Sequence, residues 1–446
     1  MRVAVVGGGI SGLVAAYRLR TALGADLDLI LLERRERLGG TLRTGRLAGE
    51  PVDVGAEAFV GRRPEIPALL DELELSEQLV HPAGRRPLIW SGGATHPLPE
   101  RTLMGIPSDP DTVAGLVDQA TLARIADEPG RPLCWEPGSD VSVAALVAER
   151  FGAQVVARSV DPLLGGVYAG RAESIGVRAA LPTLAAALDA GAPNLTAAVS
   201  RALPPPSSAP VFGGLRDGYR VLLDGLRRAA APKVEIDTPA TGLVRTAHGW
   251  RVDPVGAVDA VVLATPAPVT AAMLRVIAPE AAAAAAGIEL SSSAVVALGL
   301  PVHTALPDNS GILVATGESL RAKAFTLSSR KWPHLAERDL AVVRASFGRF
   351  GDETPLSWSD EELIAAAVAD LATVTGLSPR PETALVQRWR GGLPQYAPGH
   401  TERIAVLEDE VAGLPRLAVA GAYLHGVGVP ACAASGTAAA QRILSD

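Results

Sequence analysis

The chain has 446 residues, more than one hydrophobic core usually organises, so we expect two or three domains. Hydrophobic residues make up 48% and aromatic residues only 4%, which favours an α/β class over a β-sandwich. The formal net charge of -7 argues against a general nucleic-acid binder, and two distant cysteines, Cys134 and Cys432, argue against a disulfide framework or a metal site.

The N-terminal segment predicts a nucleotide-binding unit. A β-branched run, Val3 to Val6, is followed by Gly7, Gly9 and Gly12 in GxGxxG spacing and then by a helical pattern. Gly7 permits the tight turn, Gly9 lets the backbone approach a pyrophosphate, and Gly12 lets helix and strand pack closely. Because no signal peptide precedes this strand and no apolar run suits a membrane span, we expect a cytoplasmic protein, free or peripheral to the membrane.

A second predicted strand, "DLDLILLE", ends on Glu33, about 20 residues after the last glycine of the motif. A carboxylate here accepts hydrogen bonds from the adenosine ribose hydroxyls; the alternative is a solvated glutamate at a strand end. Further on, Gly39 and Gly40 form a second glycine pair, and Arg37 and Arg43 lie near enough in sequence to serve a diphosphate. This second segment favours FAD over a nicotinamide cofactor.

The middle of the chain predicts further elements in three groups. "DVSVAALVAERFG" is a predicted helix that Asp140 caps at its start and Gly152 ends, and residues 203–210, "LPPPSSAP", have the composition of a linker. A β-turn-β pair is followed by a strand from Ala260 to Ala264, and the alanines at 281–286 predict a helix. A mainly antiparallel domain is predicted from the strands "SSSAVVALGLPV", "GILVATG" and "LAVVRASFG".

The C-terminal stretch from Leu417 to Gln441 contains no formally charged residue, which leaves three readings open: a membrane span, a buried helix or a ligand-facing helix. "RLAVAGA" predicts a strand that ends on Gly421 and Ala422, followed by a loop and a helix that begins near Pro430. Small residues dominate its first turns, and they allow the backbone to come within hydrogen-bond distance of a ligand. The glycine placement therefore favours the ligand-facing helix.

Several of these segments carry a family resemblance. The GxGxxG motif, Glu33, "RLGGTLRT" and "VDVGAEAF" resemble the amine oxidase and protoporphyrinogen oxidase superfamily of flavoproteins. "DPLLGGVYAGRAESIGVRAALP", "FGGLRDGYRVLLDGL" and "RWRGGLPQYAPGH" resemble the bacterial, oxygen-dependent porphyrinogen oxidases of haem synthesis, and the resemblance covers nearly the whole chain. "VGAEAF" and "GGVYAG" resemble the cytoplasmic type of Gram-positive bacteria, which oxidises coproporphyrinogen III to coproporphyrin III.

The resemblance implies a Rossmann-like FAD-binding domain, a mixed-sheet substrate-binding domain and a helical subdomain. The FAD-binding domain would comprise residues 1–58, 212–268 and 408–446, the substrate-binding domain 59–84, 163–211 and 269–407, and the helical subdomain 85–162. It also implies non-covalent FAD. The predicted cofactor-binding residues are Gly7, Gly9, Ile10, Ser11, Gly12, Glu33, Arg34, Gly39, Gly40, Thr41, Gly55, Ala56, Glu57, Val234, Trp389, Gly421, Gly428 and Val429.

The substrate implied by the resemblance carries propionates, which need cations. Bidentate pairing with carboxylates suits arginine, although each candidate could equally be a solvated surface residue. Arg178 flanks the "GVYAG" segment, and His425 beside the flavin loop is expected to be a hydrogen-bonded structural residue rather than a base. Gln395 either lines the cavity or packs, and no catalytic base is assigned. The predicted substrate-binding residues are Arg62, Arg63, Tyr168, Arg171 and Tyr396.

The expected function is a six-electron oxidation of coproporphyrinogen III with oxygen as the acceptor, and protoporphyrinogen IX is the alternative substrate. Two alternative hypotheses are other enzymes: a flavin amine oxidase with an aromatic cage, and a carotenoid desaturase with a long apolar tunnel. A hypothesis from a different class is a non-catalytic carrier that binds flavin and porphyrin. The expected partners are the porphyrinogen, molecular oxygen and, in transient contact, the next enzyme of haem synthesis.

Overall fold

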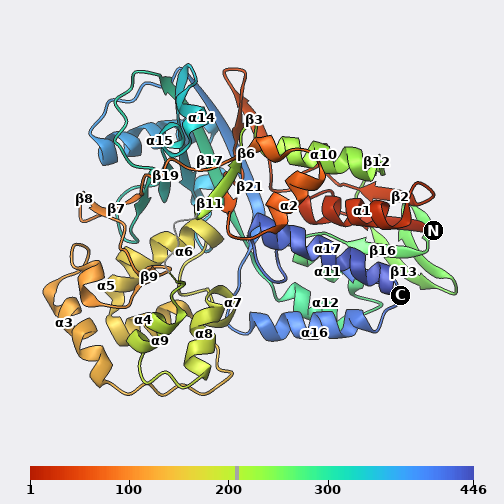
Figure 1. The fold of residues 1–446 in the computed structure, drawn as a ribbon, viewed down its shortest axis with the longest axis horizontal. Helices are drawn as coiled ribbons and strands as arrows, with labels where there is room; N and C mark the ends of the chain where they lie inside the picture. Colours follow the sequence, from red (N-terminus) through yellow and green to blue (C-terminus); the bar gives the residue numbers. More distant parts are fainter. Residues whose placement is uncertain (206–209) are drawn as a thin grey trace.

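The computed structural model describes residues 1–205 and 210–446 (Figure 1). Its first layer is a five-stranded sheet in the order β12-β2-β1-β16-β22, in which every neighbouring pair is parallel. Segments far apart in sequence supply these strands, so the sheet ties the ends of the chain to its middle. The strands are β1 (Arg2–Val6), β2 (Asp28–Leu32), β12 (Lys233–Glu235), β16 (Ala260–Leu263) and β22 (Leu417–Val419).

Both faces of this sheet are buried, as is usual for a parallel sheet. Because side chains alternate along a strand, Val3 and Val5 pack into one core while Ala4 and Val6 pack into the other. The first core is closed by α1 (Ile10–Leu23), α2 (Glu65–Glu72), α10 (Arg220–Ala230) and α17 (Val429–Ser445). The second core is closed by α11 (Ala267–Leu274), α12 (Pro279–Ala286), α16 (His400–Ala412), β13 (Gly242–Thr246), β14 (Gly249–Asp253) and β15 (Gly256–Val258).

A second, seven-stranded sheet has the order β21-β17-β20-β19-β18-β7-β8. It is mixed, because β18 and β7 pair in parallel while its other neighbours are antiparallel. The helix α15 (Asp360–Thr375) packs on it and begins at a capping box formed by Ser359 and Glu362. The strands are β7 (Leu88–Ser91), β8 (Ala94–Pro97), β17 (Leu290–Pro301), β18 (Gly311–Val314), β19 (Ala324–Thr326), β20 (Leu340–Phe347) and β21 (Thr383–Pro394).

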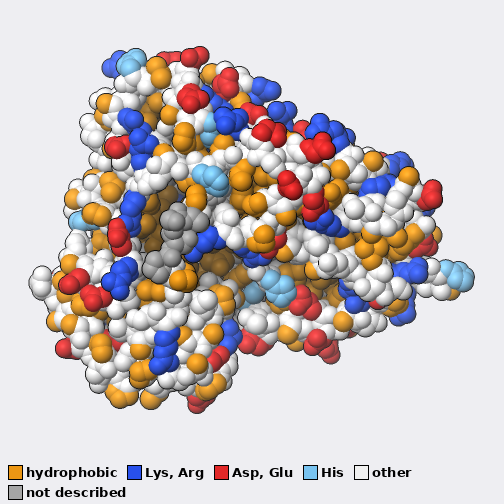
Figure 2. All heavy atoms as spheres, viewed as in Figure 1, with side chains coloured by type: hydrophobic (Ala, Val, Ile, Leu, Met, Phe, Trp, Pro, Cys, Tyr) orange, Lys and Arg blue, Asp and Glu red, His pale blue; other side chains and the backbone are white. Residues whose placement is uncertain are grey.

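A helical lobe with its own core lies at the lower left of Figure 1. Arg150 and Glu128 form a buried ion pair within it, with Nη2 and Oε1 2.8 Å apart. Figure 2 shows the surface hollowed between this lobe and the rest of the chain, with hydrophobic and basic side chains along the rim. The lobe contains α3 (Gln119–Asp127), α4 (Val143–Phe151), α5 (Ala153–Val155), a π-helix (Val156–Val160), α6 (Asp161–Tyr168), α7 (Val177–Ala180), α8 (Pro182–Asp189) and α9 (Leu195–Ala202).

Short elements join these parts. A three-stranded antiparallel sheet in the order β5-β11-β6 runs beside α2, and β3 and β4 form a hairpin. Two short helices precede β20. These elements are β3 (Thr44–Leu47), β4 (Glu50–Asp53), β5 (Phe59–Val60), β6 (Leu79–Val80), β9 (Thr102–Leu103), β10 (Ile106–Pro107), β11 (Phe212–Leu215), α13 (Ser328–Lys331) and α14 (Pro333–Ala336).

The expected α/β class, with a Rossmann-like sheet, a mixed sheet and a helical part, is confirmed, while the domain boundaries stay predictions. Asp140 was wrongly predicted as a helix cap: Ser142 caps α4, and Asp140 instead accepts hydrogen bonds from the backbone N–H groups of Arg178 and Gly399. β22 ends at Val419, so the next glycine lies in a loop rather than in the strand. Residues 206–209 of the predicted linker lie outside the described residues.

No helix in the described ranges is long and apolar enough to cross a membrane.

Candidate functional site

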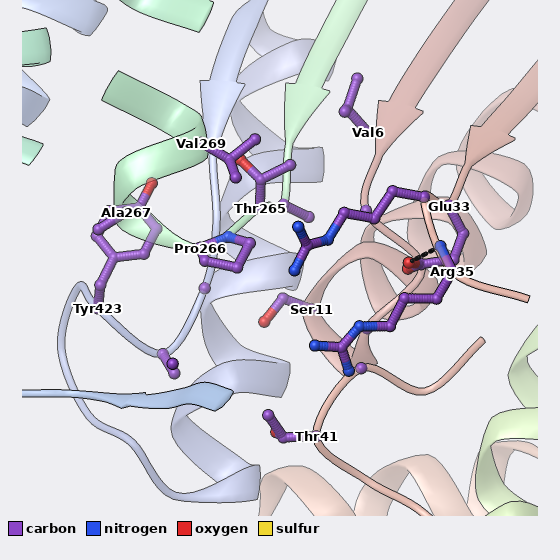
Figure 3. Close-up of a pocket in the computed structure, with 18 of the residues that line it drawn as sticks. Val6, Ser11, Glu33, Arg35, Thr41, Thr265, Pro266, Ala267, Val269 and Tyr423 are labelled. Atoms are coloured by element: carbon purple, nitrogen blue, oxygen red, sulfur yellow. Dashed lines mark hydrogen bonds between the residues drawn. The ribbon is translucent and has the colours of Figure 1, made fainter. Parts of the chain in front are cut away.

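A cavity of about 370 Å³ opens at the carboxyl ends of β1, β2 and β16, the usual ligand position in a parallel sheet. Figure 3 shows Glu33 and Arg35 on one side of it, Thr265 and Val269 on the other, and Ser11 between them. Loops from both sheets and from the C-terminal segment therefore meet around one space.

The three glycines of the GxGxxG motif play different structural parts. A Cβ atom on Gly7 would lie 2.2 Å from the Ala264 carbonyl oxygen, and one on Gly12 would lie 1.9 Å from the Gly7 carbonyl oxygen. The φ angle of Gly7 is +108°, a region that L-residues rarely adopt. A Cβ on Gly9, by contrast, would have only the Cα of Gly40 nearby, at 4.0 Å. The fold therefore requires Gly7 and Gly12, whereas Gly9 leaves open space in the cavity.

The second glycine pair lies directly against the first motif. The backbone N–H of Gly39 donates to the Gly8 carbonyl at 2.8 Å, and a Cβ on Gly40 would lie 3.3 Å from the Cα of Gly9. Both glycines have positive φ angles, +103° and +59°. A Cβ on Gly39 would lie 2.7 Å from the Leu42 carbonyl oxygen. Positive φ angles and close packing thus explain why glycine occupies positions 39 and 40.

Glu33 is held at the edge of the cavity with only 6% of its surface exposed. The backbone N–H of Gly8 donates to its Oε2 at 3.0 Å, and that of Arg35 donates to its Oε1 at 2.9 Å. Each carboxylate oxygen can accept a further hydrogen bond, so this fixed acid suits ribose hydroxyls. Arg34 and Arg35 also line the cavity.

Neither Arg37 nor Arg43 lines the cavity, and both guanidinium groups have partners within the protein, so their diphosphate role stays a prediction. The guanidinium of Arg37 donates to three backbone carbonyls of its own loop, including that of Gly40 at 2.9 Å. Arg43 donates to the side chain of Gln387.

The opposite end of the cavity is formed by β21 and the C-terminal segment. Gly391 and Gly392 line it, together with Gly421, Tyr423 and Cys432, whose thiol lies near the carbonyls of Gly426 and Val427. Burial raises the pKa of that thiol to about 12, so it stays neutral.

The N-terminal part of α17 reaches this end of the cavity, but its small residues also have a packing reason. A Cβ on Gly436 would lie 2.2 Å from the carbonyl oxygen of Ser11, where α17 crosses α1. The interpretation of these small residues as purely ligand-facing was therefore incomplete.

Ten of the predicted cofactor-binding residues line the cavity, and eight do not. The ten are Gly7, Gly9, Ile10, Ser11, Glu33, Arg34, Gly39, Gly40, Thr41 and Gly421. The eight that lie outside its lining are Gly12, Gly55, Ala56, Glu57, Val234, Trp389, Gly428 and Val429. Their cofactor contacts stay predictions.

Besides Gly12, structural contacts account for three more of these eight residues. Burial alone would raise the pKa of Glu57, but Lys331 at 3.0 Å and Arg344 at 3.4 Å outweigh it and hold the pKa below its usual range. The indole N–H of Trp389 donates to a backbone carbonyl at 2.9 Å. Val234 lies in β12 and pairs with a residue of β2.

The predicted substrate-binding residues do not converge on this cavity. Tyr396 is buried, its hydroxyl donates to the Ala422 carbonyl at 2.5 Å, and its ring lies 5.6 Å from that of Tyr168. Because Ala422 lines the cavity, Tyr396 packs behind the lining. Arg63 is ion-paired with Glu65, whereas Arg62 is exposed and Arg171 partly exposed.

Three further residues from the sequence interpretation have clear partners. Arg178 is ion-paired with Asp189 at 2.9 Å. Gln395 packs rather than lining the cavity, and its side-chain amide donates to the Tyr168 carbonyl at 2.8 Å. The ring of His425 is hydrogen-bonded to Glu408 at 2.7 Å, as expected of a structural histidine.

The lining segments that sequence reasoning missed include Thr238 to Ala240, Thr265 to Val269 and the β21 residues Arg390, Gly391, Gly392 and Pro394. The first two share a sequence signal. The segments at Thr238 and at Thr265 both begin with Thr-Pro-Ala, and each follows a strand of the parallel sheet, β12 or β16. The repeated tripeptide after two predicted strands was a usable signal, since ligands bind where parallel strands end.

Comparisons with known proteins agree with this geometry. The family model described as flavin containing amine oxidoreductase matches residues 10–444. Over 433 residues the chain is 55% identical to a protein of Mycobacterium tuberculosis (strain H37Rv) named coproporphyrinogen III oxidase, covering 96% of this chain and 94% of that protein.

Solved structures give the same picture. A candidate protoporphyrinogen oxidase from Exiguobacterium sp. 255-15 superposes with a TM-score of 0.87 and 30% identity, covering 100% of this chain and 99% of the other. A putrescine oxidase bound to putrescine, 17% identical with a TM-score of 0.69 and 100% coverage of both chains, shares the fold. The chain therefore belongs to the flavin-containing amine oxidoreductase family and is a flavin-dependent oxidoreductase.

Proposed function

We propose that the protein oxidises coproporphyrinogen III to coproporphyrin III in haem synthesis, with non-covalently bound FAD and molecular oxygen as the electron acceptor. The observation that carries this proposal is the 55% identity, along 96% of the chain, to a relative named coproporphyrinogen III oxidase. A likeness that extends over both sheets and the helical lobe covers the substrate side as well as the cofactor side.

The cavity suits FAD in particular. Gly9 leaves room beside the N-terminus of α1, where a pyrophosphate is stabilised by free backbone N–H groups and the helix dipole. Glu33 is fixed where an adenosine ribose would lie, a contact that FMN, which has no adenosine, could not make. These two features support the dinucleotide form of the flavin.

Two nearby side chains bear on how the flavin is held. Cys432 lines the cavity, its thiol is neutral and buried, and burial of this kind makes a thiol unreactive. His425 is directed to Glu408 and does not line the cavity. Both features favour a non-covalent cofactor.

The proposed reaction removes six electrons and six protons from the porphyrinogen and reduces three molecules of oxygen to hydrogen peroxide. When bound, the flavin supplies a hydride acceptor that passes its electrons to oxygen. The chain must hold the tetrapyrrole beside the cofactor and exclude water. Transient transfer of the product to the next enzyme of haem synthesis is part of the proposal.

One observation weighs against the amine oxidase alternative. Within the described ranges, Tyr423 is the one aromatic residue that lines the cavity. An aromatic cage around an amine would need a second aromatic side chain there. Protoporphyrinogen IX stays the closest alternative substrate, because the Exiguobacterium relative is classed with protoporphyrinogen oxidases.

The test is the reaction of purified, FAD-loaded protein with coproporphyrinogen III, with and without oxygen. We expect catalysed porphyrin formation in air, three molecules of hydrogen peroxide per porphyrin, and release of intact FAD when the protein is denatured. Bound FAD without catalysed turnover would favour the carrier reading, and flavin that stays on the denatured chain would contradict non-covalent binding.

A further inference from the structure

Three basic side chains that have no ion-pair partner among the described residues gather between α6 and the ends of β19 and β20, two interior strands of the mixed sheet. They are Lys323, just before β19, Arg349, just after β20, and Arg171, just after α6, and all three are partly exposed. In the part of the chain that the structure describes, none of the three forms an ion pair. We call these three residues the basic recess.

Lys323 and Arg349 in the basic recess donate hydrogen bonds to uncharged groups, but neither has an ion-pair partner in the described part of the chain. The Nζ of Lys323 donates to the Gly348 carbonyl at 2.7 Å, and the guanidinium of Arg349 donates to the hydroxyl of Thr316 at 2.9 Å. The nearby acid, Asp161, accepts from the same Thr316 hydroxyl at 2.9 Å and from a backbone N–H at 2.7 Å. Asp352 also lies near Arg349, to which it is paired through the backbone. Two carboxylates thus lie near the three cations, and in the described residues neither forms an ion pair with any of them.

This arrangement is costly for the empty protein. Burial, and then the charge of Arg349, lower the pKa of Lys323 to about 7, and burial lowers the pKa of Arg349. Enclosed charges without a counter-charge destabilise a fold, and methionine or leucine would fill the Lys323 position at less cost. A carboxylate brought by a ligand would supply the missing counter-charge.

The basic recess lies close to the cofactor cavity. Gly348, which accepts the hydrogen bond from Lys323, packs on Ser292, whose carbonyl oxygen would lie 3.1 Å from a Cβ at that glycine. The hydroxyl of Ser292 accepts from the backbone N–H of Gly391 at 3.0 Å, and Gly391 lines the cofactor cavity. One strand, β17, therefore separates the basic recess from the cavity wall.

The "GVYAG" segment reaches the same place. The backbone N–H of Phe350 donates to the Ala169 carbonyl at 2.7 Å, which holds the end of α6 against the segment that carries Arg349. Val167 on the same helix is 42% exposed, so this segment also presents an apolar side chain to the surface. An apolar surface beside cations suits a tetrapyrrole with carboxylate side chains.

We infer that Lys323 and Arg349, with Arg171 beside them, bind a propionate of the substrate and select a tetrapyrrole with four carboxylates over one with two. Coproporphyrinogen III carries propionates at the two positions where protoporphyrinogen IX carries vinyl groups, so a cation placed there distinguishes the two. The inference rests on the proposed function and names residues that would determine its specificity.

The decisive variant is Lys323→Met, which keeps the length of the side chain and removes its charge. We expect KM for coproporphyrinogen III to rise about tenfold to a hundredfold, the effect of losing one hydrogen bond between charged groups, while KM for protoporphyrinogen IX changes less than about threefold. Lys323→Arg should keep the preference. Because the variant removes an unpaired charge, its melting temperature should not fall.

Lys233→Met is the matched control, since the Lys233 side chain is 71% exposed and lies in β12, away from the basic recess. Equal effects of Lys323→Met on both substrates, or no effect on either, would overturn the inference. Arg349→Gln repeats the test at the second cation, so the outcome does not depend on one variant folding.

Wild-type protein separates the inference from the proposed function. If it oxidises neither porphyrinogen, the proposed function fails, and dissociation constants for coproporphyrin III and protoporphyrin IX then replace KM in the same comparison. A Lys323→Met variant that loses affinity only for the four-carboxylate porphyrin supports the basic recess in either case, and equal losses for both overturn it.

Discussion

Replacing Gly9 by alanine separates the needs of the fold from those of the cofactor. The φ and ψ angles of Gly9, -73° and 179°, are open to any residue, and the added Cβ would lie 4.0 Å from its nearest neighbour. We therefore expect the unfolding free energy of the flavin-free protein to change by less than about 1 kcal/mol. If FAD binds as we propose, the same methyl group would occupy space that the pyrophosphate needs.

The expected loss of affinity follows from the hydrogen bonds at the start of α1. A displaced pyrophosphate loses one or two bonds from backbone N–H groups to charged oxygens, each worth about 1.5–3 kcal/mol, so FAD should bind at least about tenfold more weakly. Gly9→Glu adds bulk and negative charge and should abolish flavin retention. The assays are flavin absorbance per chain, titration of the flavin-free protein with FAD, and chemical unfolding.

Gly12→Ala is the control, because its Cβ would lie 1.9 Å from the Gly7 carbonyl oxygen and must disturb the fold itself. A Gly9→Ala protein with unchanged FAD affinity would refute the placement of the pyrophosphate. A Gly9→Ala protein that is as unstable as Gly12→Ala would refute the claim that the fold has room at Gly9.

Three further outcomes are expected. Burial raises the pKa of Asp53 to about 7, above its unfolded value, so the unfolding free energy of the wild type falls as pH rises from about 4 to 7. Asp53→Asn should therefore raise the unfolding free energy by up to about 4 kcal/mol near pH 8 and by less near pH 5. Equal increases at both pH values would contradict this. Arg150→Met leaves Glu128 buried without its cation and should cost about 3–5 kcal/mol in urea unfolding; a loss under about 1 kcal/mol would count against it. His425→Gln should keep flavin content and kcat, because the ring contacts Glu408 outside the cavity. A variant that loses flavin would contradict a purely structural role for His425.

Much of the nucleotide-binding part could be predicted from the sequence because its constraints are local. The GxGxxG glycines and Glu33 lie within one strand-helix-strand unit, where spacing alone fixes their positions. The roles of Gly7 and Gly12 are visible in the backbone contacts they make.

Other features could not be predicted, because they depend on contacts between distant segments. Ser142 rather than Asp140 caps α4, because the Asp140 carboxylate accepts a hydrogen bond from the backbone N–H of Gly399, which is 259 residues away. Arg37 looked suited to a phosphate in sequence, yet the fold of its own loop presents carbonyls that its guanidinium satisfies first.

The basic recess illustrates the same limit. Lys323 and Arg349 each lie beside a segment with an ordinary strand pattern, and their sequence neighbours do not indicate that the two side chains lie close together. Only the pairing of β19 with β20 brings them together, beside a segment that ends α6. Unpaired charge becomes visible once the three-dimensional contacts are known.

We propose that a porphyrinogen with four carboxylates is the substrate of this protein. The most direct test mixes purified, FAD-loaded protein in air with coproporphyrinogen III or with protoporphyrinogen IX and follows porphyrin fluorescence, with spontaneous oxidation subtracted. We predict a higher kcat/KM for coproporphyrinogen III. Faster oxidation of protoporphyrinogen IX, or no catalysed oxidation of either substrate, would contradict the claim.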